Sequence, residues 1–102
     1  MQWVVLETTY DSDLVKKALV SLVIETTLLE IEKEMYDKVV HDLYKKYHCY
    51  IPDCYEHPEY LNEILKSLYG NAHNVVVEKI NKQLEEFSYH KSICHFVKIL
   101  NQ

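Results

Sequence analysis

Glycine and proline are scarce in this sequence. The chain has one glycine, Gly70, and two prolines, Pro52 and Pro58. β-Sandwiches and barrels need turn residues about every 8–12 positions, so we do not expect an all-β fold. A single glycine also excludes the glycine-rich phosphate loops of P-loop and dinucleotide-binding proteins.

Arginine is absent, because all eleven basic residues are lysines. The planar guanidinium group is the main side chain for bidentate recognition of phosphates and guanine edges. The lysines are dispersed among sixteen acidic residues, and the formal net charge is −5. No basic stripe forms, so we do not expect the chain to bind nucleic acid.

Long hydrophobic runs are also missing. The apolar run Trp3–Leu6 follows no basic residue, which does not match a secretory signal. Other apolar stretches are far shorter than the ~18 residues of a membrane-spanning helix. We therefore expect a cytoplasmic protein without a membrane contact, in which the three cysteines, an odd number, are reduced thiols.

Hydrophobic periodicity is what the sequence does contain. Its 102 residues are the size of one domain, 1–102, and predict an all-α, compact bundle of four to five helices. From Leu14 to Leu29 the polar stripe is narrow, so this helix should be the most buried one. A second, amphipathic segment runs to Tyr47. Because no glycine or proline lies between Leu14 and Tyr47, one long helix is the alternative. We favour a break near Thr26, since Thr27–Glu30 has the form of a capping box.

Turn residues organise the second half of the chain. His48–His57 is expected to be a loop, because each proline disfavours helical geometry in the residue before it. Pro58 fits the first position of a third helix, which Gly70 ends. A fourth helix follows, and Ile93–Leu100 is either a fifth helix or its continuation. The run Trp3–Leu6 is expected to be extended or packed on the bundle.

A faint internal repeat relates the two halves. Val39 and Leu43 match Val76 and Ile80 at an offset of 37 residues (76 − 39 = 37). Two pseudo-repeated, antiparallel helix pairs are one explanation. A shared amphipathic period is the other, and the sequence leaves both open.

The predicted loop holds a cluster of metal-ligand side chains. Cysteine and neutral histidine are the natural ligands of zinc; the candidates here are His48, Cys49, Cys54 and His57. Structural zinc sites usually have a second ligand pair farther along the chain. Only Cys94 and His95 could complete this one, if the last helix folds back onto the loop. Zinc or iron binding is therefore the alternative interpretation, and buried cysteines with turn histidines are the simpler one.

Catalytic patterns are weak. Cysteine beside histidine could act as a nucleophile and base, but neither cysteine lies in a known nucleophile motif. The acidic residues between Glu30 and Asp37 lack the Glu-x-x-His pairs of di-metal bundles, so we interpret them as a solvated face. We expect no cofactor and no enzymatic activity.

Tyrosine is unusually frequent, with nine residues. Tyrosine is enriched at protein interfaces, where an apolar ring must keep its hydroxyl group wet. Five tyrosines gather around the loop: Tyr44, Tyr47, Tyr50, Tyr55 and Tyr60. They form either an interaction surface or a cover for a small core.

The segment His57–Ala72 contains Pro58, a spaced aliphatic helix and an aromatic–glycine turn at Tyr69–Gly70. In this it resembles a small archaeal family of helical domains of unassigned function, which occur alone or as output modules of signalling proteins. The resemblance covers roughly residues 14–84. It implies a compact regulatory or interaction module, and it transfers no catalytic residues. The sequence thus favours a non-enzymatic interaction module that binds a protein partner or itself.

Overall fold

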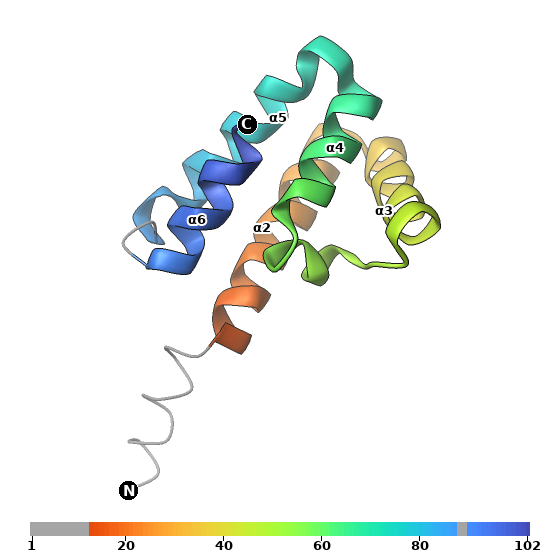
Figure 1. Cartoon of the computed structure of the whole chain (residues 1–102). Coiled ribbons are helices and arrows are strands. Elements are labelled where there is room, and N and C mark those ends of the chain that lie inside the picture. The colour runs from red at the N-terminus through yellow and green to blue at the C-terminus, as the bar shows by residue number, and fades with distance from the viewer. Residues whose placement is uncertain (1–12, 88–89) are drawn as a thin grey trace, which may run out of the picture.

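A bundle of helices makes up the described part of the chain (Figure 1). The structure is a computed structural model, and it describes residues 13–87 and 90–102. The α-helices are α2 (Asp13–Ile31), α3 (Lys33–Tyr47), α4 (Pro58–Tyr69), α5 (His73–Leu84) and α6 (Lys91–Leu100). Short 3-10 helices are η1 (Ile51–Tyr55), η2 (Gly70–Ala72) and η3 (Glu85–Phe87). The predicted all-α bundle is confirmed, and the last segment is a separate helix.

Three further observations concern the start of the chain, the first turn of α2 and the lengths of the helices. The predicted placement of Trp3–Leu6 lies outside the described residues. Asp13 is an acidic residue in the first turn of α2, where it interacts favourably with the helix dipole. Within residues 13–87 and 90–102, no helix combines the length and hydrophobicity needed to cross a membrane.

The boundary between the first two helices is not where we predicted it. Helix α2 continues through Thr26 to Ile31, and the break falls at Glu32, whose backbone is extended (φ −169°, ψ 126°). The Thr26 hydroxyl donates a hydrogen bond to the Leu22 carbonyl oxygen at 2.9 Å. The Thr27 hydroxyl accepts one from the Gln83 side chain at 2.9 Å. Both hydroxyls are thus satisfied inside a packed helix, and neither caps a new one.

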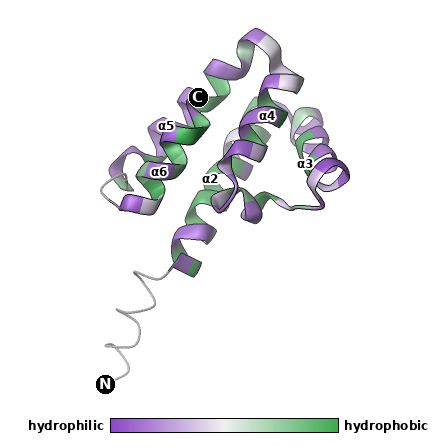
Figure 2. Cartoon of the chain, viewed as in Figure 1, coloured by the Kyte–Doolittle hydropathy of each residue, from purple (hydrophilic) through white to green (hydrophobic). Residues whose placement is uncertain are grey.

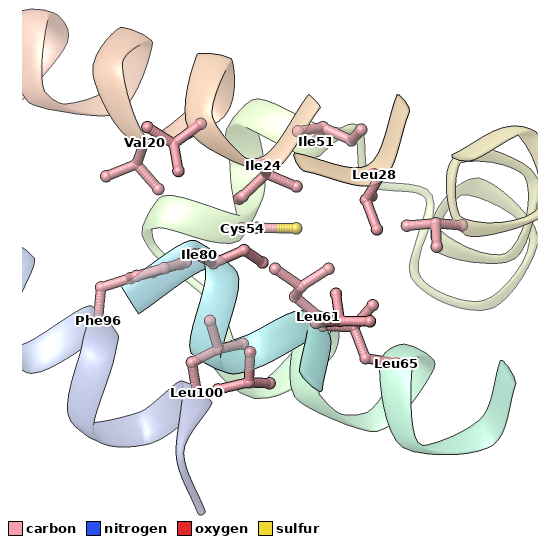
Figure 3. Close-up of a cluster of buried hydrophobic side chains, with 14 of the residues drawn as sticks. Val20, Ile24, Leu28, Ile51, Cys54, Leu61, Leu65, Ile80, Phe96 and Leu100 are labelled. Atoms are coloured by element: carbon pink, nitrogen blue, oxygen red, sulfur yellow. The ribbon is translucent and has the colours of Figure 1, made fainter. Parts of the chain in front are cut away.

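Side chains from all the α-helices and η1 meet in one core. Helix α4 packs against α3, α5 and α6, while α2 packs against α3, α5 and η1. Apolar and polar residues alternate along the helices (Figure 2), as amphipathic helices require. Cys54 lies among the buried aliphatic residues of α2, α4 and α5 (Figure 3). The loop after α3 is therefore part of the core and not only a connection on the surface.

The residues that suggested a repeat are mostly core residues. Val39, Leu43, Val76 and Ile80 are all buried. A shared amphipathic period places such residues inward in any helical bundle. Duplication therefore stays a prediction, with no additional support from burial.

Helix α4 begins and ends as predicted. Pro58 is in its first turn, and Gly70 ends it with φ 56° and ψ −125°, its N–H donating to the Lys66 carbonyl oxygen. Positive φ with this ψ is a conformation that is almost confined to glycine. The end of the helix at Gly70 therefore requires glycine, because other residues rarely adopt this backbone conformation.

We expect Gly70→Ala to lower the free energy of unfolding by about 1–3 kcal/mol. A Cβ atom at this position would meet nothing within 4 Å, so the cost arises from the backbone conformation alone. Urea denaturation of the variant measures it, with Ser67→Ala as the control, since Ser67 is exposed in the preceding turn. Equal stability of the two variants would contradict the prediction.

Candidate functional site

The predicted loop 48–57 contains regular structure. Helix α3 ends at Tyr47 and is capped by His48, whose backbone is left-handed (φ 55°). The His48 N–H donates to the Tyr44 carbonyl oxygen at 2.9 Å. The chain then enters η1, in which Pro52 lies in the first turn. Proline is tolerated there because that N–H group has no helical partner. The prediction of a wholly irregular loop is therefore wrong for Ile51–Tyr55.

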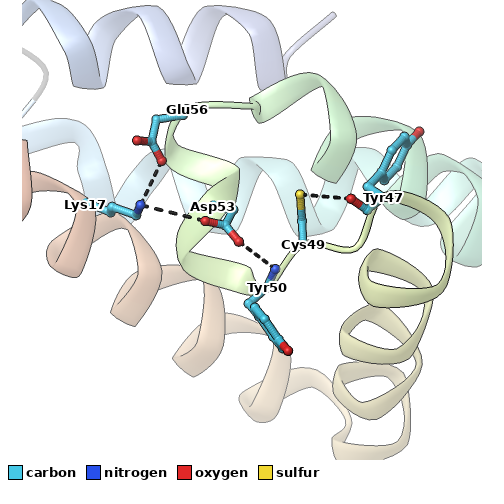
Figure 4. A network of polar contacts seen from close by, with 6 residues as sticks. All are labelled: Lys17, Tyr47, Cys49, Tyr50, Asp53 and Glu56. Atoms are coloured by element: carbon cyan, nitrogen blue, oxygen red, sulfur yellow. Dashed lines mark hydrogen bonds and ion pairs between the residues drawn. The ribbon is translucent and has the colours of Figure 1, made fainter.

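Asp53 connects η1 to α2 (Figure 4). One carboxylate oxygen accepts a hydrogen bond from the Tyr50 N–H at 2.9 Å, and the other lies 3.8 Å from the Lys17 ammonium nitrogen. Lys17 also forms an ion pair with Glu56 at 2.8 Å. That hydrogen bond to Glu56 raises the pKa of Lys17. These contacts hold the loop against the first turns of α2.

The candidate metal ligands are in different environments. Cys54 is buried, whereas His48 and His57 are exposed. Cys49 donates its S–H to the Tyr47 carbonyl oxygen at 3.4 Å, and His57 Nδ1 lies 3.1 Å from a Glu59 carboxylate oxygen. Across residues 13–87 and 90–102, which include Cys94 and His95, no three His, Cys, Asp or Glu side chains gather as a metal site would require. Metal binding by this loop thus gains no support from the geometry.

Burial changes the chemistry of Cys54. Desolvation, with a smaller contribution from Cys49, raises the pKa of the Cys54 thiol to about 12. A nucleophilic cysteine needs a lowered pKa, because the thiolate is the reactive form. Cys54 is therefore built as a small core residue, in agreement with the simpler of the two sequence interpretations.

Three of the aromatic side chains stack in one column. The rings of Tyr47 and Tyr60 lie 4.0 Å apart and nearly parallel, and His57 stacks on Tyr60 at 4.6 Å. The Tyr47 hydroxyl donates to a Glu63 carboxylate oxygen, and this hydrogen bond raises the pKa of Tyr47 to about 12. Lys46 pairs with the other oxygen of Glu63 at 2.7 Å. The column joins α3, the loop and α4, and its two tyrosines are half-buried.

Tyr44 and Tyr50 form a second and more exposed aromatic group. Their side chains are 51% and 58% exposed, and their ring centroids lie 5.6 Å apart. His48 meets the edge of Tyr44, also at 5.6 Å. These three side chains border a shallow hollow of about 540 Å³ together with Val40, His41 and Lys45. An aromatic hollow with nearby hydrogen-bonding groups is suited to contact with another protein.

Tyr55 is separate from both groups. Its hydroxyl donates to a carboxylate oxygen of Asp13, at the start of α2, at 3.3 Å. The side chain is half-buried against the core. The structure therefore divides the five predicted interaction tyrosines into an exposed pair, a stacked pair and one residue that fastens η1 to α2.

Helix α2 also exposes apolar side chains. Leu14 is 74% exposed and Leu22 is 57% exposed, and Leu29 is also exposed. With Ala18 and Pro52, the first two line a hollow of about 410 Å³. Helix α2 has six buried residues, more than any other described helix, yet part of its apolar stripe is exposed. Hydrophobic periodicity indicated a wide apolar face on this helix. The other described segments of the bundle cover only part of that face.

The sequence could have separated these tyrosines. Tyr47 continues the i, i+4 row of Val39 and Leu43, which are buried, and α4 covers it, whereas Tyr44 lies off that row and is exposed. Comparisons of the chain with protein-family models, with curated proteins and with solved structures found no match.

Proposed function

We propose that this chain is a non-enzymatic protein-interaction module, and that Tyr44, Tyr50 and His48 form its contact surface. The observation that carries the proposal is the pair of large aromatic side chains left more than half exposed around one hollow. Aromatic rings are the side chains most often found at the energetic centre of interfaces. Two neighbouring exposed aromatic rings give a partner's apolar surface a place to pack.

The other predicted tyrosines support this surface from behind. The Tyr47–Tyr60–His57 column and the Glu63 contacts fix the end of α3, which carries Tyr44 and His48. Asp53 holds the backbone of Tyr50. Binding then costs less conformational entropy, because the backbone that carries these rings is already held in place.

A regulatory role in the cytoplasm is part of this proposal. It rests on the resemblance of residues 14–84 to helical output modules, and on the three free thiols, which fit a reducing compartment. The partner is expected to present an apolar surface with hydrogen-bond acceptors for the tyrosine hydroxyls.

The test compares the proteins retained from a lysate of the source cells by three forms of the full chain. We expect the double variant Tyr44→Ser/Tyr50→Ser to lose at least one partner by more than about tenfold, since truncating a central aromatic residue costs roughly 2 kcal/mol or more. The control is Val75→Ser, which removes a side chain that is 54% exposed on α5. Quantitative mass spectrometry measures retention. Identical profiles for all three forms would contradict the proposal.

A further inference from the structure

A hollow lies beside the first half of α2, where this helix meets η1, and we call it the α2 hollow. Its apolar lining is Leu14, Ala18 and Leu22 of α2 together with Pro52 of η1, and polar side chains complete it. The three α2 residues follow one another at four-residue intervals, so they share one face of the helix. All four apolar side chains are exposed. The described residues thus leave an apolar cluster open to water, as is typical of a surface that contacts another segment or molecule.

The α2 hollow is too small to hold two separate molecules together by itself. Four apolar side chains line it, whereas a stable interface between two proteins takes about 20–30 residues from each. A free molecule must also offset the translational and rotational freedom that it loses on binding. A segment of the same chain that is attached beside the hollow avoids most of this cost, because its effective concentration there is in the millimolar range. The size of the hollow therefore favours an occupant from the chain itself.

Residues 1–12 are attached at one end of the α2 hollow. They join α2 at Asp13, and they contain the apolar run Trp3–Leu6 followed by a mostly polar link of six residues. A link of this length reaches up to about 20 Å when extended, and its aspartate and serine residues favour a turn of the chain. Leu14 and Leu22 are about 12 Å apart along the helix axis, at about 1.5 Å per residue. The apolar run can therefore reach every part of the hollow.

We propose that the run Trp3–Leu6 binds the α2 hollow of its own chain, with an apolar side chain of the run over Ala18, between Leu14 and Leu22. Ala18 has the smallest side chain of the lining and leaves room for a large one. The contact removes apolar surface of both the run and the hollow from water. This inference is independent of the proposed function, since it uses none of the residues of the tyrosine surface.

Acrylamide quenching of tryptophan fluorescence in the full chain tests the proposal, because Trp3 is the only tryptophan. We expect weaker quenching in the folded protein than in urea. Leu22→Glu should increase the quenching by about twofold or more, toward the value of the unfolded chain, because a carboxylate in the hollow disfavours the burial of apolar side chains beside it. Val75→Glu is the matched control, since it adds the same charge at an exposed position on α5, and its quenching should equal that of the unchanged protein. Circular dichroism confirms that each variant is folded.

A second variant and a change of protein concentration complete the test. Leu14→Glu should also increase the quenching, and an acidic residue in the first turn of a helix does not destabilise it. The quenching of the unchanged protein should not depend on its concentration, because the contact lies within one chain. Quenching of Trp3 as strong as in urea would overturn the proposal. Quenching that neither variant changes would overturn it as well, since Trp3 would then be buried elsewhere. Quenching that weakens as the protein concentration rises would place a second copy in the hollow and would also overturn it.

Discussion

Replacing Phe96 by alanine should lower the free energy of unfolding by about 3–5 kcal/mol, the range for truncating a buried aromatic side chain. Phe96 is 0% exposed and is the largest of the fully buried side chains. It projects from α6 into the core that α6 shares with α4 and α5 (Figure 3). Its loss removes the transfer free energy of the ring and leaves a cavity that rigid neighbouring helices cannot fill.

Urea denaturation followed by circular dichroism measures this effect. A small domain has about 5–15 kcal/mol of stability in total, so the alanine variant should unfold at much lower urea concentration. Phe96→Leu keeps most of the volume and should lose considerably less. Val75→Ala serves as the surface control, because its side chain is largely exposed already. A Phe96→Ala protein as stable as this control would mean that α6 is not docked on the core.

The second large effect concerns pH and Cys54. The pKa of the folded thiol is raised from its ordinary value of 9.0 to about 12 by burial. The fold thus favours the neutral thiol. The stability that the fold gains from this neutral thiol is fully present below pH 9. It is lost as the pH rises through about 12, because the thiol of the unfolded chain loses its proton at a lower pH than the folded one. Three pKa units correspond to roughly 4 kcal/mol at the upper end of this window.

Comparison with Cys54→Ala isolates this thiol. Other groups titrate at alkaline pH in both proteins, and their effects cancel in the difference between the two stabilities. We expect that difference to be constant below pH 9 and to shift in favour of the alanine variant as the pH rises toward 12. Alkylation gives an independent measurement: at pH 8, Cys49 should react faster than the buried Cys54. A difference in stability that does not change with pH would show that the thiol is exposed to water.

Helix ends were predictable where local chemistry determines them. Pro58 and Gly70 each have a backbone restriction that only a few conformations satisfy, and α4 begins and ends at these residues. At Thr26 the local signal was misleading, because a hydroxyl that could cap a helix can also bond within one. The break at Glu32 has no hydrogen bond from a capping side chain. It is set by the need to bring Val39 and Leu43 back to the core, which is a tertiary requirement.

The candidate surface was predictable only as a set of residues. Residue type and frequency indicated the five tyrosines, but exposure depends on which element covers each ring. Tyr47 is covered by the Tyr60 ring, whereas Tyr44, beside Tyr50 and His48, stays 51% exposed. The apolar face of α2 shows the same limit. Hydrophobic periodicity shows how wide the apolar face of a helix is. How much of that face is buried depends on how many other segments of the chain pack against it.

The single extended residue between α2 and α3 limits how this protein can change in length. Because only one residue separates the two helices, a residue inserted at Glu32 would either extend a helix, which turns the following side chains by about 100°, or displace the start of α3 relative to α2. Val39 and Leu43, both fully buried, would then leave the core, and polar residues of α3 would enter it. Insertions and deletions at this junction should therefore be eliminated by selection, so that homologues keep the spacing between Leu28 and Val39 even where their side chains differ.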